Sequence, residues 1–271
     1  MKKISAVIID TYQNKKMAAI AAKMVRQVSN IGTIYTLSNT PLGIEGEKFL
    51  KIPEIKTTND YSSMVLENLD EIVQSDHFLI FQWDGFPTHA NNWNEEFLNY
   101  DYIGSPDGGW VGNGGFSLRS KKLLKAIKHL GIKIDKNNPF IQTEDMLICY
   151  HYRAQLENEG IKFAPLSIAE KFSFDANPHK KPVFGFHGPG NFPLIIKEVQ
   201  LITLLDDIIA RMPNPQTMQK FIISCLNEGM LDLIKVLLKD FRNKPQLLNT
   251  FYFEKANSPH SSMIELFEKN S

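Results

Sequence analysis

Cysteine is scarce in this chain, and its charges cancel. Only two of the 271 residues are cysteines, Cys149 and Cys225, and their wide separation in apolar surroundings fits neither a metal knuckle nor a redox pair. We expect both to be buried thiols in a reducing compartment. The 30 basic and 30 acidic residues leave no net charge, so no overall field attracts a nucleic acid, and we predict no nucleic-acid partner.

Long hydrophobic runs are also missing. No stretch approaches the roughly 18 consecutive apolar residues of a membrane-spanning helix. The apolar run near the N-terminus has the length of a strand and is too short for a secretory signal. We therefore expect a cytoplasmic protein, working either free or at the inner face of a membrane. No pattern indicates an oligomeric state.

The chain does contain enough apolar residues, 43%, to bury a sizeable core. Patterns typical of strands and helices alternate along its first part, over residues 4–9, 15–29, 32–37, 61–74 and 77–82. A polar, proline-containing connection is predicted over 38–59. This alternation predicts an α/β fold with a mixed, mostly parallel sheet flanked by helices. Ligands of such sheets bind beyond the carboxyl ends of the strands.

The pattern changes after residue 197. Three amphipathic stretches at 198–212, 215–228 and 230–241 predict successive helices separated by proline and glycine. We therefore predict two parts, a ligand-binding catalytic domain at 1–197 and a C-terminal helical region at 198–271. Helices of this kind usually pack on their own protein, and peripheral membrane contact stays open as the alternative.

A glycine-rich segment suggests a place where backbone approaches a ligand. Gly112, Gly114 and Gly115 lack the Cβ atoms that would keep a sugar or phosphate away, and glycine tolerates a positive φ. Asn113 lies between them. The alternative is a tight turn that leads into the helix predicted to begin near Lys121.

Two adjacent carboxylates follow this segment. Glu144 and Asp145 fall in the first turn of a helix predicted over 144–158, with Thr143 as its N-cap. One of them is a candidate general base that takes a proton from an incoming hydroxyl while the other orients it. The alternative is that both only stabilise the helix through its dipole.

Asp84 and His187 are the candidate metal ligands. Asp84 directly follows the apolar strand at 77–82, where a carboxylate can reach a cation at the sheet edge. Mn²⁺ or Mg²⁺ on a diphosphate needs few protein carboxylates, because phosphate oxygens complete its coordination. His187 lies in a loop rich in glycine and aromatic residues, and imidazole suits Mn²⁺ better than Mg²⁺. The alternatives are a turn aspartate and a packed histidine.

Aromatic side chains are frequent around these segments. Most are expected in the core, and Trp110, beside Gly108 and Gly109, is the best candidate for an exposed stacking platform. Arg119 is a candidate partner either for a phosphate or for an acid on the sheet edge. The residues that we expect to contact a donor are Gln82, Trp83, Asp84, Gly85, Trp110, Asn113, Gly114, Gly115, Phe116 and Arg119.

Together these segments resemble one family, the bacterial uncharacterised glycosyltransferase-like domains of surface-polysaccharide gene clusters, which are similar to GT-A-fold glycosyltransferases. The resemblance covers roughly residues 4–195 and depends on 81–86, Trp93, 97–106, 112–120, Glu144, Asp145 and 184–188. It implies a GT-A-like (Rossmann-like) fold, a nucleotide-sugar donor, and a glycan or lipid-linked acceptor. It also implies a divalent metal, Mn²⁺ or Mg²⁺.

The resemblance further implies roles for single residues. Asp84 matches the last aspartate of the Asp-x-Asp metal motif of GT-A enzymes, but Gln82 stands where the first aspartate would be. This departure weakens the expectation of metal dependence, because an amide holds a cation less well than a carboxylate. His187 resembles the histidine that completes the metal site. Asp145 resembles the catalytic base, and Glu144 its acceptor-orienting partner.

The hypothesis from the sequence is therefore an inverting glycosyltransferase that acts in bacterial surface-polysaccharide synthesis. One alternative is a carbohydrate- or nucleotide-binding module without turnover, suggested by Gln82. A second alternative is a nucleotidyltransferase, although the basic phosphate loop typical of that class is missing from residues 10–14.

Overall fold

The structure is a computed structural model that describes residues 3–107, 109–135, 137–138, 142–175, 183–212 and 214–241. The chain divides into two compact units, Met1–His187 and Gly188–Ser271. The candidate site residues all belong to the first unit.

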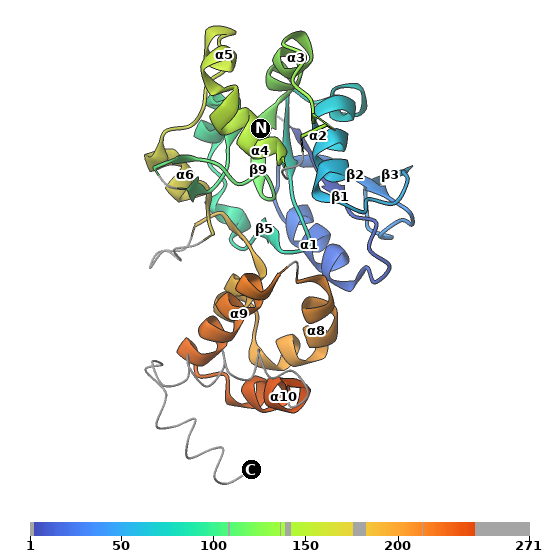
Figure 1. Cartoon of the computed structure of the whole chain (residues 1–271), viewed down its shortest axis with the longest axis vertical. Helices are drawn as coiled ribbons and strands as arrows, with labels where there is room; N and C mark the ends of the chain where they lie inside the picture. The colour runs from blue at the N-terminus through green and yellow to red at the C-terminus, as the bar shows by residue number, and fades with distance from the viewer. Residues whose placement is uncertain are drawn as a thin grey trace. The chain divides into compact units, whose positions relative to one another are not determined.

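A six-stranded sheet of order β3-β2-β1-β4-β9-β6 forms the centre of the first unit (Figure 1). Its strands are β1 (Ile4–Ile9), β2 (Ile31–Ser38), β3 (Glu47–Lys51), β4 (His77–Ile80), β6 (Tyr102–Ile103) and β9 (Ser117–Ser120). The first four strands are parallel, and β9 runs antiparallel to both of its neighbours. The predicted α/β fold with a mixed, mostly parallel sheet flanked by helices is confirmed.

Helices cover both faces of this sheet. On one face, Val7 packs with Leu69 of α2 (Thr58–Ile72) and Leu124 of α3 (Lys121–His129), and these two helices lie side by side (Figure 1). On the other face lies α1 (Lys16–Arg26), which buries Met17, Ala18, Ala21, Ala22 and Val25. Strand β1 is buried along its whole length because it has a helix layer on each side.

The edge strand β3 occupies part of the segment for which the sequence predicts a polar connection. It pairs in parallel with β2, with Thr36 opposite Phe49. Its residues Glu47, Lys48 and Lys51 give it no apolar alternation, so the sequence pattern does not reveal it. Charged side chains of this kind are common on exposed edges, where they oppose pairing with another chain.

Two small sheets and several short helices lie between β4 and β11. One sheet has the order β10-β11-β5, and the other pairs β7 with β8. Their bounds are β5 (Gly85–Pro87), β7 (Pro106–Asp107), β8 (Trp110–Val111), β10 (Ser173–Phe174) and β11 (Gly185–His187). The short helices are η1 (Ala90–Asn92), η2 (Glu95–Asn99) and α6 (Leu166–Phe172). Buried aromatic rings pack among these elements, with Phe116 stacked on Phe172 at 5.0 Å.

The helix predicted over 144–158 is not continuous. It begins as α4 (Glu144–Met146), widens into the π-helical turn η3 (Leu147–His151), and ends as α5 (Arg153–Asn158). The N–H of Tyr152 donates to the carbonyl of Leu147, five residues earlier, at 2.9 Å. Such π-helical turns are rare and occur frequently at functional sites. Periodicity could not predict this one, because its single extra residue leaves the apolar pattern on either side intact.

The second unit is helical in the part that the structure describes. It contains η4 (Pro189–Asn191), α7 (Phe192–Ile195), α8 (Glu198–Arg211), α9 (Pro215–Asn227) and α10 (Leu231–Phe241). The three helices predicted after residue 197 are therefore confirmed, and Glu198 accepts the N–H of Leu233 at 2.9 Å. Cys149 and Cys225 are free and buried, as predicted. None of the described helices is long and apolar enough to cross a membrane.

Candidate functional site

The first wall of the candidate site is a tight turn at the end of β4. The N–H of Gln82 donates to the carbonyl of Gly85 at 2.9 Å, and the N–H of Gly85 donates back at 3.2 Å. Trp83 and Asp84 therefore occupy the tip of this turn, beyond the carboxyl end of a parallel strand. The carboxylate of Asp84 is largely buried, with 10% of its side chain exposed.

His187 faces this turn from the last residue of β11. The antiparallel pairing of β11 with β5 places it opposite Gly85. Its Nε2 lies 3.2 Å from Oε1 of Gln82 and 3.9 Å from Oδ1 of Asp84. Burial lowers the pKa of His187, but the carboxylates of Asp84 and Asp175 outweigh it and raise this pKa to about 9. A Cβ atom at Gly85 would lie 2.7 Å from the imidazole, so glycine is needed there.

The segment Gly112–Gly115, here called the glycine loop, connects the histidine to the acid pair. A Cβ atom on Gly115 would collide with the side chains of His187 and Gln82, and one on Gly114 would collide with Glu144. The N–H of Gly114 donates to Oδ2 of Asp145 at 2.9 Å. Adjacent residues of one loop therefore contact the Asp84–His187 pair and the acid pair.

Asn113 gives the glycine loop its shape. Its φ of 56° lies in the left-handed region, which asparagine tolerates better than most residues do. Its Oδ1 accepts the N–H of Gly115 at 3.3 Å, and its Nδ2 donates to Oδ2 of Asp175 at 2.6 Å. Both polar atoms of the Asn113 side chain therefore help to hold the loop in this conformation.

Glu144 and Arg119 form a buried ion pair below the loop. Nη2 of Arg119 lies 2.7 Å from Oε1 of Glu144, with 0% and 4% of the two side chains exposed. The same nitrogen donates to the carbonyl of Gly114 at 3.3 Å, and Nε donates to Oγ of Ser117 at 3.0 Å. The sequence predicts ligand contacts for Arg119 and Glu144, whereas the structure buries both. Of the two partners considered for Arg119, the acid is the one that it has.

Asp145 has a different environment although it is the next residue. Its side chain is partly exposed, and its two carboxylate oxygens accept the N–H groups of Gly114 and Met146 at 2.9 and 2.8 Å. Both bonds hold the carboxylate in one orientation while each oxygen keeps a further lone pair. The start of the helix depends less on Thr143, which makes no capping bond; Ser62 of α2 accepts the N–H of Glu144 instead, at 3.1 Å.

Asp175 is a site residue that the sequence patterns missed. It follows β10, and its Oδ2 lies 3.8 Å from Nδ1 of His187 in addition to accepting from Asn113. The available signal was a short segment with two phenylalanines, Phe172–Phe174, that is directly followed by an acid. Two residues are too few for a period-two pattern, so this strand could not be predicted.

Few side chains near Asp84 could act as metal ligands. In the part of the chain that the structure describes, no three His, Cys, Asp or Glu side chains are grouped so as to hold a metal ion. The oxygens of Asp84 and Gln82 and the imidazole of His187 nevertheless meet at the turn, and these are ligand types that Mn²⁺ accepts. Such a site fits an ion whose remaining positions are filled by phosphate oxygens or water.

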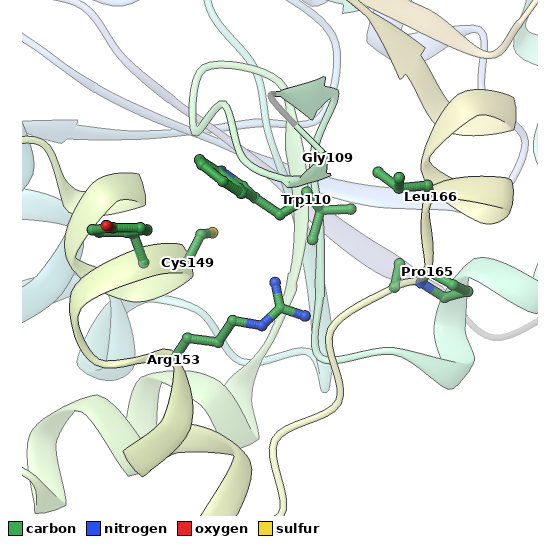
Figure 2. Close-up of a pocket in the computed structure, with 9 residues that line it drawn as sticks. Gly109, Trp110, Cys149, Arg153, Pro165 and Leu166 are labelled. Atoms are coloured by element: carbon green, nitrogen blue, oxygen red, sulfur yellow. The ribbon is translucent and has the colours of Figure 1, made fainter.

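The remaining predicted residues fall in two places. Phe116 is fully buried among aromatic rings, so its expected contact with a donor does not agree with its position in the core. Trp110 is 38% exposed, in agreement with its prediction as an exposed platform. It lines a pocket beside the glycine loop, and Figure 2 shows it among other residues that line this pocket, including Cys149, Arg153 and Leu166.

A family model described as "Protein of unknown function (DUF5672)" matches residues 45–187. The chain belongs to this family. The matched region begins just before β3 and ends at His187, so it includes the turn, the glycine loop and both acids. No curated protein matches the chain.

Several solved structures resemble the chain at low identity. One is a glycosyltransferase involved in the glycosylation of the major capsid of PBCV-1, with TM-score 0.48, 12% identity, and coverage of 68% of this chain and 92% of that one. The glycosyltransferase GlyE of Streptococcus pneumoniae TIGR4 has TM-score 0.42, 14% identity, and coverage of 79% and 52%. The mannosyltransferase PcManGT of Pyrobaculum calidifontis, solved with GDP-Man and Mn²⁺, has TM-score 0.42, 9% identity, and coverage of 99% and 85%.

Proposed function

We propose that the chain is a glycosyltransferase that moves a sugar from a nucleotide-sugar donor to a hydroxyl group of a glycan or lipid-linked acceptor, with inversion at the anomeric carbon. The observation that carries this proposal is the glycine loop. Gly114 binds the carboxylate of Asp145, and its neighbour Gly115 packs against His187 beside Asp84. A candidate base and a candidate diphosphate site therefore lie on either side of one strip of backbone.

In this proposal, Asp84 and His187 would hold the divalent metal that binds the donor diphosphate. The metal-ligating atoms at the turn fit Mn²⁺ or Mg²⁺, which when bound would neutralise charge on the departing nucleoside diphosphate. Gln82 supplies a neutral oxygen at the same place. Trp83, at the tip of the turn, is a further donor contact.

Asp145 acts as the general base. Its carboxylate is partly exposed and oriented by two N–H groups, so it can accept a proton from an acceptor hydroxyl that approaches the anomeric carbon from the opposite side. Glu144 does not touch the substrate in this scheme. It is a positioning residue that, through Arg119, holds the carbonyl of Gly114 and with it the loop.

The first test is thermal stability of the purified protein with UDP, GDP, TDP or CMP, each with and without Mn²⁺. A ligand present at about 100 times its dissociation constant adds roughly 2.7 kcal/mol to the stability of the folded state. The expected result is a metal-dependent increase in melting temperature with one nucleotide, which also names the donor class. No increase with any member of the panel would contradict the assignment of the turn as a nucleotide site.

A binding module without turnover is the second candidate, and one contact favours it. Gln82 in place of an aspartate accepts from His187 at 3.2 Å, so the imidazole already has a neutral partner within the protein. This candidate predicts nucleotide or glycan binding with no consumption of any donor. A nucleotidyltransferase would instead release pyrophosphate, which a coupled assay separates from nucleoside diphosphate release.

The wider setting is part of the same proposal. The reaction belongs to the synthesis of bacterial surface polysaccharide and takes place in the cytoplasm, with a catalytic domain at 1–197 and a helical region at 198–271. The described helices of the second unit, α8 to α10, then serve to keep the protein near its acceptor. Deleting 198–271 tests this: an unchanged distribution between membrane and soluble fractions would contradict a role in membrane contact.

A further inference from the structure

The pocket that Trp110 lines lies beside the glycine loop. Its volume is about 340 Å³, and its walls include Trp110 of β8, Tyr150 of η3, Arg153 of α5, and Leu166 of α6 (Figure 2). The scheme for the donor and the base uses none of these side chains. The pocket is therefore a separate surface for which a ligand can be sought.

Two partly exposed aromatic rings lie next to each other in this pocket. Trp110 is 38% and Tyr150 is 57% exposed, and their ring centroids lie 5.7 Å apart at an angle of 39°. Side chains of this size are usually buried, so their shared exposure on one wall is unusual. Rings that present an apolar face and a polar edge suit the apolar face of a sugar ring, with the hydroxyl of Tyr150 free to bond at the rim.

Arg153 supplies the charge. It is the single charged residue among the described residues that line the pocket. Its guanidinium stacks over the ring of Phe163 at 4.5 Å, and its Nε lies 3.0 Å from Oε1 of Glu157. Figure 2 shows the guanidinium directed toward the space between Trp110 and Pro165. Its terminal N–H groups therefore form a planar fork that matches a carboxylate or a phosphate.

The π-helical turn connects this pocket to the proposed base. Asp145 lies just before η3, whose residues Cys149 and Tyr150 line the pocket, and Arg153 follows at the start of α5. Val111, which also lines the pocket, leads directly into the glycine loop. Burial raises the pKa of the Cys149 thiol to about 12, so this residue stays neutral and is no nucleophile.

We infer that the pocket binds a sugar unit of the acceptor that carries an acidic group, either a carboxylate or a phosphate, with Trp110 and Tyr150 against the ring and Arg153 on the acid. The identification of this ligand as the acceptor rests on the proposed function, whereas the expectation of an acidic sugar rests on the pocket alone. Asp145 in α4 and the pocket residues of η3 and α5 belong to consecutive helical segments, as expected if an acceptor held in the pocket presents its hydroxyl to that carboxylate.

Fluorine NMR of fluorotryptophan-labelled protein tests both statements separately. The chain has three tryptophans, so three resonances are expected, and Trp110→Phe assigns the one in the pocket. The probes are methyl glucoside, its uronic acid methyl glucuronide, its phosphate ester, and UDP with Mn²⁺. We expect the acidic glycosides to move the Trp110 resonance at concentrations about tenfold or more below those needed for neutral methyl glucoside.

Substitutions locate the contact. Arg153→Gln should weaken the response to the acidic glycosides about tenfold and leave methyl glucoside unchanged, whereas Lys133→Gln, an exposed basic residue outside the pocket, should change neither. Arg153→Lys retains the charge but not the planar fork, so an intermediate loss is expected. Glu157→Gln should strengthen binding, because a carboxylate that competes for the guanidinium is removed.

The outcomes separate the two proposals. No response of Trp110 to any glycoside, or an equal response to neutral and acidic ones, overturns the inference even if UDP moves one of the other two tryptophan resonances. A response of Trp110 to an acidic glycoside, with neither a nucleotide response nor donor consumption, supports the pocket and overturns the glycosyltransferase. A stronger response to the phosphate ester than to the glucuronide identifies phosphate as the acidic group.

Discussion

Charged groups lie on both sides of the glycine loop, but they differ in exposure. Below the loop, Glu144 and Arg119 face each other at 2.7 Å with 4% or less of either side chain in contact with solvent. Above it, Asp145 is partly exposed, and Asp175 and His187 are 33% and 20% exposed. The buried pair can hold the loop but cannot meet a ligand. The exposed group can meet a ligand because the buried pair keeps the loop in place.

The largest expected effect is on Asp145. Asp145→Asn keeps the shape but only one of the two N–H contacts, because an amide has a single acceptor oxygen. It also removes the basicity, so transfer should fall about a thousandfold, within the usual range for a general base. The thermal shift with the nucleotide should remain. Turnover is measured as nucleoside diphosphate release, and rates near those of the unmodified protein would contradict the assignment of the base.

Glu144→Gln should act mainly on folding. It leaves the buried guanidinium of Arg119 without a counter-charge, which costs about 3 to 5 kcal/mol of unfolding free energy, measured by urea denaturation. The double variant with Arg119→Met should lose less than the sum of the single changes. If Glu144→Gln reduces turnover without any loss of stability, Glu144 contacts the substrate after all.

The turn at Asp84 should respond to metal. Asp84→Asn should raise the Mn²⁺ concentration that is needed for half of the nucleotide-dependent thermal shift by about tenfold or more, because a carboxylate ligand is lost. Gln82→Asp supplies a second carboxylate at the same turn and should lower that concentration. Equal responses of the two variants would place the metal elsewhere.

The smallest expected effect concerns the conformation of the loop. Asn113→Gly keeps the positive φ but loses the bonds to Asp175 and Gly115, whereas Asn113→Ala also forces a Cβ residue into the left-handed region. The alanine variant should therefore be about 1 kcal/mol less stable than the glycine variant. Equal stabilities by urea denaturation would show that the loop relaxes away from this conformation.

The sequence predicted those parts of the fold that depend on residues close together in the chain. Helices α2 and α3 and the three helices after residue 197 have apolar faces and defined ends; α2, for example, begins with a capping box between Thr57 and Asp60. The parallel sheet followed from the alternation of strand and helix. The edge strand β3 and the two-residue strand β10 were missed, because one carries charges and the other is too short for a period.

The candidate site was predicted by residue type but not by environment. Gly114, Gly115 and Asp84 were named as candidates because glycine lets backbone approach a ligand closely and an aspartate after a strand can reach the sheet edge. Asp175 could not be linked to His187 and Asn113, because strand pairing and loop geometry bring these residues together across gaps in the sequence. The ion pair between Arg119 and Glu144 could not be predicted either, because it joins β9 to α4 across 25 residues of the chain.

The sequence by itself determined the fold class, the three helices after residue 197, the buried thiols and the residues of the glycine loop, since each depends on composition or short-range periodicity. Only the tertiary structure decided that Glu144 is buried while its neighbour Asp145 faces outward, and that Trp110 shares a pocket with Tyr150 and Arg153. The physical reason is that burial and partner choice are set by which elements pack together, and adjacent side chains on a helix point in different directions.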